Sequence, residues 1–185
     1  MNIYLDNTNS RHSLYPFTHT RHTADIRIGI LTIREKWEKL TGFKVSTAQE
    51  ELKEDSIVVD AALIPVQSNF EAILEAAKNK QNLPGTTDIK RLQQPWNIFQ
   101  FNDWALRSDF ELLTPDRTSK DISSTNQLIS PGNIFVEEGA EVSHSILNAS
   151  TGPIYIGKNA QVLEGCLIRG PFSLGNNALL KMGTK

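Results

Sequence analysis

The stretch that decides the fold runs from Ile156 to Lys185 and divides without remainder into blocks of six residues, IGKNAQ, VLEGCL, IRGPFS, LGNNAL and LKMGTK. The first place of every block is aliphatic: Ile156, Val162, Ile168, Leu174 and Leu180. The fifth places form a second column of Ala160, Cys166, Phe172, Ala178 and Thr184. A period of six is not the period of a helix, about 3.6 residues. It predicts short strands joined by tight turns around a triangular coil, with both columns pointing inward.

The same pattern extends upstream, where VEEGAE and VSHSIL begin at Val136 and Val142. The step from Val142 to Ile156 is 14 residues, two more than two blocks, so we expect a small turn insertion there. One alternative is an ordinary β-sheet, because six is a multiple of the strand period of two. Cys166 stands at an inward place, which favours a small buried core residue over a nucleophile.

These blocks resemble the hexapeptide-repeat left-handed parallel β-helix of bacterial transferases, in which three blocks normally make one coil. The resemblance implies an acyltransferase-type β-helix, assembly as a homo-oligomer (trimer), and acetyl-CoA as acyl donor in full-length relatives. Seven blocks give little more than two coils, and the pattern is still in phase at Lys185. We therefore expect a helix that is cut short, either by truncation or by completion with a partner.

Residues 1–125 have a different sequence pattern, in which strand and helix signals alternate as in an α/β domain. Asn2–Asp6 is predicted to be the first strand, and Ile57–Val59 a buried strand. Thr32 and Glu35 form a capping box at the start of a helix that Gly42 ends. A second helix carries apolar residues at helical spacing: Phe70, Ile73, Leu74 and Ala77.

Two polar stretches separate these elements. Residues 82–88, NLPGTTD, are predicted to be a loop, and residues 114–130 are predicted to be a linker rich in Ser, Thr, Asp and Asn. We therefore expect two domains, a shortened α/β domain over residues 1–125 and the hexapeptide coil over residues 126–185. No strands are expected between Ala77 and Ile89, which makes the first domain short for a complete nucleotide-binding domain.

Composition restricts the classes of function. A net charge of -2 and a 22% share of charged residues leave no basic excess to attract nucleic acid or a membrane surface. No apolar run approaches the roughly 20 residues that span a bilayer. The sequence shows no N-terminal export signal, and its single cysteine cannot form an internal disulfide, so we expect a cytoplasmic protein.

The most informative N-terminal stretch is LYPFTHTRHTADIRIG, residues 14–29, which leads directly into ILTIREKW. It resembles the start of GlmU-like proteins of the Bacteroidetes, described as sugar nucleotidyltransferases with a C-terminal β-helix. A second correspondence is QPWNIF, residues 94–99, with Asn102 and Leu106, which resembles the PWD-x-F-x-x-N segment of sugar nucleotidyltransferases. The two matches and the coil together span nearly the whole chain.

The resemblance implies a Rossmann-like nucleotidyltransferase domain that moves a nucleotidyl group from a nucleoside triphosphate to a sugar 1-phosphate. Pyrophosphate is the second product, and Mg²⁺ is the implied cofactor. In bifunctional relatives an acetyl group also moves from acetyl-CoA to glucosamine 1-phosphate. We assign substrate binding to residues in the matching segments: Thr18, Thr20, Lys36, Trp96 and Asn102.

The chain departs from the family at the loop after the first strand. Characterised relatives place G-x-G-T-R there, because glycines let backbone N–H groups close around phosphates. Asp6 to His12 contains no glycine. The catalytic cations are therefore sought in the arginine-rich segment from His12 to Arg27, whose only carboxylate is Asp25, and we assign Arg21 and Arg27 as catalytic. A structural ion pair is the alternative for each, and Lys36 is expected on the solvated face of its helix.

Histidines, aspartates and aromatic residues are further candidates for a metal, a base or a sugar. His12, His19 and His22 share one segment but lack compact helical spacing, and no metal ligands are assigned. Asp60, Asp103 and Asp109 are candidate magnesium ligands that nothing in the sequence brings together. Tyr15, Phe17 and Trp96 could flank a base or sugar, with core packing as the alternative. Two other functions stay open: a hexapeptide-repeat acyltransferase, and a non-catalytic scaffold or regulatory subunit without a complete active site.

Overall fold

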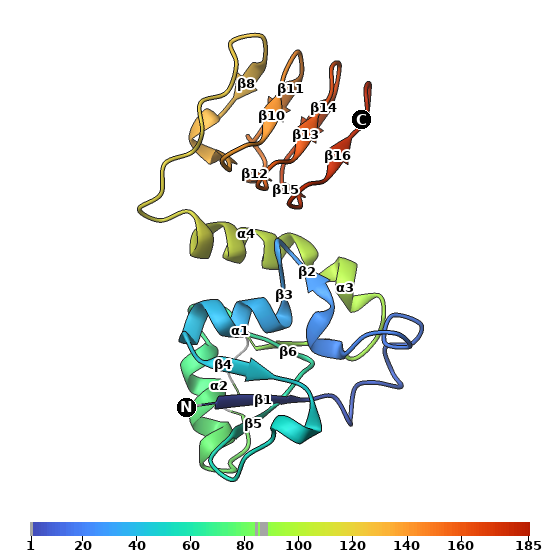
Figure 1. The fold of residues 1–185 in the computed structure, drawn as a ribbon, viewed down its shortest axis with the longest axis vertical. Helices are drawn as coiled ribbons and strands as arrows, with labels where there is room; N and C mark the ends of the chain where they lie inside the picture. The colour runs from blue at the N-terminus through green and yellow to red at the C-terminus, as the bar shows by residue number, and fades with distance from the viewer. Residues whose placement is uncertain (1, 84, 86–88) are drawn as a thin grey trace. The chain divides into compact units, whose positions relative to one another are not determined.

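The computed structural model describes residues 2–83, 85 and 89–185 (Figure 1). Of the predicted loop at 82–88, residues 84 and 86–88 lie outside this described part. The chain divides into two compact units, Met1–Ala105 and Leu106–Lys185, and each has its own hydrophobic core. None of the described helices is long and apolar enough to cross a membrane.

A parallel sheet forms the centre of the N-terminal unit. Its strands are β1 (Asn2–Asp6), β4 (Lys44–Ser46) and β5 (Ile57–Asp60), in the order β4-β1-β5. Figure 1 shows β1 between its two neighbours. The predicted first strand is confirmed at both ends. The predicted Ile57–Val59 strand is confirmed in place, but Val58 is 48% exposed because alternate residues of a strand face opposite sides.

Helix α1 (Ile33–Thr41) follows its predicted caps. The Thr32 hydroxyl accepts from the Glu35 backbone N–H at 3.2 Å, and the Glu35 carboxylate accepts from the Thr32 N–H at 2.7 Å. Gly42 ends the helix with φ of 67°, a left-handed conformation that favours glycine. The capping-box prediction is therefore confirmed.

Lys36 corrects one expectation. Its side chain is fully buried, with 0% exposure, although a solvated helix face was expected. The buried residues of α1 are Ile33, Lys36 and Trp37, which stand at i, i+3 and i+4 and so share one stripe of the helix. The helical spacing, and not the residue type, therefore sets the burial of Lys36.

The remaining elements of this unit surround the sheet. Two antiparallel pairs are β2 (Arg27–Ile28) with β3 (Leu31–Thr32), and β6 (Leu63–Ile64) with β7 (Lys90–Arg91). The helices are η1 (Thr23–Asp25), η2 (Gln49–Glu51), α2 (Phe70–Lys78), α3 (Asn97–Gln100) and α4 (Asn102–Leu113), which crosses into the second unit. The predicted second helix is confirmed by α2.

The C-terminal unit contains a coil of three parallel sheets, ordered β8-β11-β14, β9-β12-β15 and β10-β13-β16. Successive strands visit the three sheets in turn, so every third strand stacks on its predecessor, as Figure 1 shows. The strands are β8 (Gln127–Ile129), β9 (Ile134–Val136), β10 (Glu141–Val142), β11 (Ile146–Asn148), β12 (Ile154–Ile156), β13 (Gln161–Val162), β14 (Leu167–Arg169), β15 (Phe172–Leu174) and β16 (Leu179–Leu180), with η3 (Pro131–Asn133) between the first two. The alternative of one ordinary sheet is wrong.

The spacing of the stacked strands explains the six-residue period. Val162 pairs with Leu180, and Ile156 with Leu174, so residues 18 apart in the sequence are neighbours and three blocks make one turn of the coil. The predicted inward columns are buried at most places. Members at most 9% exposed are Val136, Ala140, Val142, Ile156, Ala160, Val162, Cys166, Ile168 and Leu174.

The irregular step between Val142 and Ile156 resolves into two parts. Leu147, and not residue 148, is the inward residue that follows Val142, since it pairs with Ile168 and is 0% exposed. The first step is therefore five residues and the second nine, from 142 to 147 and from 147 to 156. The predicted insertion lies between Leu147 and Ile156, after a step that is one residue short.

The compact C-terminal unit begins before the expected boundary at residue 126. Residues 106–126 belong to it because their side chains bond to the coil: Arg107 Nη2 donates to the Thr151 carbonyl at 2.7 Å, and Lys120 Nζ to the Ala140 carbonyl at 2.8 Å. The linker prediction is wrong at its end, where residues 127–129 form β8. Leu128 packs against the coil core, and this strand completes a third coil that the hexapeptide count had missed.

Candidate functional site

Two carboxylates end neighbouring strands at the carboxyl edge of the N-terminal sheet. Asp6 ends β1 and Asp60 ends β5, and the two residues are partners in the parallel register. The chain passes from β1 to β4 on one side and then to β5 on the other, so β1 and β5 flank a topological switch point. Open α/β sheets bind ligands outside the carboxyl ends of strands at such points.

The two carboxylates are differently engaged. Asp60 forms an ion pair with Arg91 and accepts from the Ala62 N–H at 2.9 Å. Asp6 uses Oδ1 to accept from the backbone and hydroxyl of Thr8, at 3.0 and 2.6 Å. Its Oδ2 has no hydrogen-bond partner among the residues that the structure describes, so Asp6 can take a further ligand.

Residues 7–22, here called the β1 loop, replace a glycine-rich loop with a chain of tight turns. Leu14 N–H bonds to the Ser10 carbonyl at 3.2 Å, and the Thr18 hydroxyl donates to the Arg11 carbonyl at 2.5 Å. Leu14 and Thr18 are both 0% exposed, and Leu14 belongs to the core of the unit. The loop is thus held by its own buried residues without any glycine.

The β1 loop contains arginines and histidines but no aspartate or glutamate. Arg11 and Arg21 are exposed, and within the described part of the chain neither has an ion-pair or hydrogen-bond partner through its side chain. Arg27 differs, because it donates to the Ile30 carbonyl and lies 3.5 Å from Glu35. The loop therefore presents two free cations, while Arg27 is engaged within its own hairpin and helix cap.

A half-buried histidine stands where the β1 loop meets η1. His22 Nδ1 accepts from the Ala24 N–H at 3.1 Å, which leaves the proton of the neutral ring on Nε2. Burial lowers the pKa of His22 below its usual value, against the opposing effect of the nearby Asp25. Asp25 itself pairs with Arg34 at 2.8 Å, and Arg34 also donates to Thr47 at 2.9 Å. His22 is therefore a neutral hydrogen-bond donor beside this ion pair.

The residues assigned from the sequence have separate positions. Thr18 is buried and holds the loop, whereas Thr20 is exposed beside Arg21. Asn102 Oδ1 accepts from the Gly29 N–H at 2.8 Å, so it fixes the turn that follows Arg27. Lys36 lies inside the core, and Trp96, at the start of α3, is 51% exposed.

The sequence reasoning missed Asp6 and the neutral state of His22. A signal for Asp6 was present, since an aspartate ends the first predicted strand and another follows the second. Of the candidate magnesium ligands, Asp60 ends β5, whereas Asp103 and Asp109 lie on α4. Within residues 2–83, 85 and 89–185, no group of three His, Cys, Asp or Glu residues is arranged to hold a metal ion.

Comparison with known families bears on this unit. Residues 3–87 match the family model described as sugar nucleotidyl transferase. Residues 3–87 are thus similar to sugar nucleotidyltransferases. The matched segment contains β1, the β1 loop and the free cations Arg11 and Arg21, and it ends before α3 and the coil. A comparison with curated proteins finds no match.

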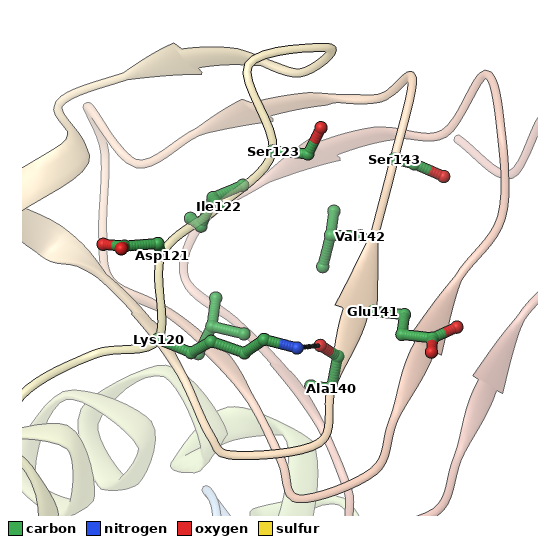
Figure 2. Close-up of a pocket in the computed structure, with 9 residues that line it drawn as sticks. Lys120, Asp121, Ile122, Ser123, Ala140, Glu141, Val142 and Ser143 are labelled. Atoms are coloured by element: carbon green, nitrogen blue, oxygen red, sulfur yellow. Dashed lines mark hydrogen bonds between the residues drawn. The ribbon is translucent and has the colours of Figure 1, made fainter.

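The C-terminal unit has a cavity of about 480 Å³ at the first turn of the coil (Figure 2). Its lining is Lys120, Asp121, Ile122, Ser123, Val136, Ala140, Glu141, Val142 and Ser143. Figure 2 shows the carboxylates of Asp121 and Glu141 pointing away from the space, and Lys120 bound to the Ala140 carbonyl. No acid–base or nucleophilic pair among these described side chains converges there, so the nucleotidyltransferase-like unit remains the candidate site.

A charged cluster stabilises the outer side of the coil. Glu137 accepts from Arg117 Nη2 at 2.6 Å and from the Tyr155 hydroxyl, and the Phe135 ring stacks on Tyr155 with centroids 5.8 Å apart. Burial by itself raises the pKa of Glu137, but the bonds from Arg117 and Tyr155 outweigh it, and the pKa lies below its usual value. Burial and the bond to Glu137 raise the pKa of Tyr155 to about 12.

Glu137→Gln is expected to destabilise the coil at pH 7 by about 1.5–3 kcal/mol, the usual range for hydrogen bonds to a charged group. A carboxylate with a lowered folded-state pKa contributes stability above its unfolded pKa of about 4.3 and loses it as the pH falls through its folded-state pKa. The difference between wild type and variant should therefore shrink in acid. Urea unfolding followed by circular dichroism at pH 7 and at pH 3 measures this, with the exposed Glu141→Gln as matched control. An equal difference at both pH values would contradict the assignment.

Proposed function

We propose that the protein is a sugar-1-phosphate nucleotidyltransferase whose active site lies at the β1 loop and the carboxyl edge of the sheet. An oxygen of the sugar 1-phosphate attacks the α-phosphorus of a nucleoside triphosphate, the bond from the α-phosphorus to the bridging oxygen breaks, and pyrophosphate leaves. The observation that carries the proposal is the pair of free arginines on a loop without carboxylates, at the switch point of a nucleotidyltransferase-like unit.

Each residue of the site has a role in this reaction. Arg21 and Arg11 bind the phosphate oxygens and stabilise the charge that develops on the leaving pyrophosphate, since guanidinium groups match phosphate geometry. His22 donates Nε2–H to a substrate oxygen without adding a charge. Thr20, the neighbour of Arg21 in the loop, binds the substrate beside it. Arg27 and Asn102 hold the hairpin that supports the loop, and this places Arg27 in a supporting role.

Magnesium is the cofactor that the family resemblance implies, and the carboxyl edge fits it. Mg²⁺ usually takes one or two carboxylates and completes its shell with water and substrate phosphates. Asp6 Oδ2 is available for this, whereas Asp60 is held by Arg91. Bound there, the ion would neutralise charge on the triphosphate.

We propose further that the coil is a left-handed β-helix, that the protein is GlmU-like, and that it assembles as a trimer. Large apolar side chains are exposed on the coil, namely Leu167, Leu179 and Met182 at 45%, 51% and 71%. Light scattering at tens of micromolar protein should therefore show a homo-oligomer, and a monodisperse monomer would reject this part.

Acyl transfer from acetyl-CoA is the second candidate function, favoured by the 18-residue turn of the coil.

The experiment for the main proposal is a pyrophosphate-release assay on the full chain. Each of the common nucleoside triphosphates is incubated with hexose and hexosamine 1-phosphates and Mg²⁺, and the nucleotide sugar is detected together with pyrophosphate. Equal amounts of the two products are expected from at least one pair. Absence of both products from every pair rejects the proposal, and acetyl transfer to glucosamine 1-phosphate in a parallel assay supports the second candidate.

A further inference from the structure

Three aromatic rings gather on the β1 loop. Tyr15 and His19 stack with ring centroids 4.0 Å apart and planes 17° from parallel. His12 meets Tyr15 at 5.1 Å and at 70°, as an edge-on contact. None of these rings is among the described residues that form the hydrophobic core of the unit.

The stack leaves one broad surface open. Tyr15 is half-buried, with neighbours on two sides, whereas His19 is exposed although one of its faces lies on Tyr15. Among the described residues, the face of His19 opposite Tyr15 has no further aromatic contact. A planar ring placed on that face would continue the stack.

We propose that this face of His19 binds the base of the nucleoside triphosphate, while Arg21 and Arg11 bind its phosphates. The inference rests on the proposed function and adds how the nucleotide is distinguished from a bare phosphate chain. Stacking accepts any planar base, because every base has a π face. The loop should accordingly bind pyrimidine and purine nucleotides alike, and both more tightly than tripolyphosphate.

The backbone that carries the stacked rings is ordered before a ligand binds. The Phe17 N–H bonds to the Leu14 carbonyl at 3.0 Å, and the His19 N–H to the Pro16 carbonyl at 3.2 Å, so consecutive turns fix the ring-bearing backbone. Buried Leu14 and Thr18 anchor the same turns. A preorganised surface binds without the entropic cost of ordering side chains.

Calorimetric titration of the full chain with UTP, ATP and inorganic tripolyphosphate tests the inference. His19→Ala should weaken UTP and ATP binding by about 5- to 150-fold, the usual range for removing a stacking ring. It should leave tripolyphosphate affinity unchanged. His19→Phe keeps a ring and should preserve nucleotide affinity. His144→Ala, an exposed histidine of the coil, is the matched control and should change none of the three.

The outcomes separate this inference from the proposed function. If nucleotides bind no more tightly than tripolyphosphate, or if His19→Ala weakens all three ligands equally, the stacking surface is refuted and the anion site stands. The same holds if His19→Phe binds nucleotides as weakly as His19→Ala. If the wild-type chain binds none of the three, the nucleotide site and the stacking surface fall together.

Discussion

Arg21→Ala is expected to lower kcat/KM for nucleotidyl transfer by about 100-fold, the lower end of the range for removing one group that stabilises transition-state charge. Arg21 is exposed on a loop without carboxylates, and no described side chain competes for its guanidinium. Its charge is therefore available to phosphate oxygens. Pyrophosphate release measured at subsaturating nucleotide gives the ratio directly.

Arg169→Ala is the matched control for this variant, because Arg169 is an exposed arginine of the coil. It should leave kcat/KM unchanged. Arg27→Ala should change the rate less than Arg21→Ala, since Arg27 is held by Glu35 and the Ile30 carbonyl. If the Arg21→Ala enzyme keeps the wild-type kcat/KM, Arg21 is not the cation that stabilises the transition state.

Ile156→Asp is expected to destabilise the coil by about 3–5 kcal/mol, because it leaves an unpaired charge in an apolar interior. Ile156 is 0% exposed and pairs with Val136 and Leu174 in the neighbouring coils. These described neighbours enclose the position, so the new carboxylate would lie out of reach of solvent. Ile129→Asp is the matched control. Ile129 lies on β8 and is 39% exposed, and its replacement should cost far less.

The two units can be followed separately in this experiment. Trp37, Trp96 and Trp104 are the tryptophans of the chain, and all three lie in the N-terminal unit. Tryptophan fluorescence therefore reports on that unit, while far-ultraviolet circular dichroism reports on both. Ile156→Asp should move the circular dichroism transition to lower urea and leave the fluorescence transition in place. Unchanged circular dichroism would contradict the inward placement of the column.

The coil could be predicted from the sequence because its period is local. Each turn repeats the same three short strands, so a residue and its stacked neighbour are related by a constant step, as Val162 and Leu180 are. The prediction was incomplete where the step changes. Leu147 is one place early, and Leu128 lies in a stretch whose polar composition hides a strand. Only the pairing with β11 reveals that strand.

The candidate site was less predictable, because it depends on pairing between distant segments. Asp6 and Asp60 are partners through strand register, and the pKa of His22 is lowered because the fold half-buries the ring. The charge of Lys36 predicts a solvated face, whereas its place three residues after Ile33 puts it on the buried stripe of α1. Local charge predicts Arg21 as a phosphate ligand, and this role stays a prediction for a residue that is exposed in the structure.

The central claim is that the β1 loop binds a nucleoside triphosphate, and calorimetric titration of the wild-type chain tests it most directly. UTP and the other nucleoside triphosphates are titrated with and without Mg²⁺, and a hexosamine 1-phosphate is titrated in the same way. Saturable heat is expected with at least one triphosphate, with binding weakened in Arg21→Ala and unchanged in Arg169→Ala. No saturable heat with any triphosphate or sugar phosphate, in either condition, would contradict it and favour a scaffold role.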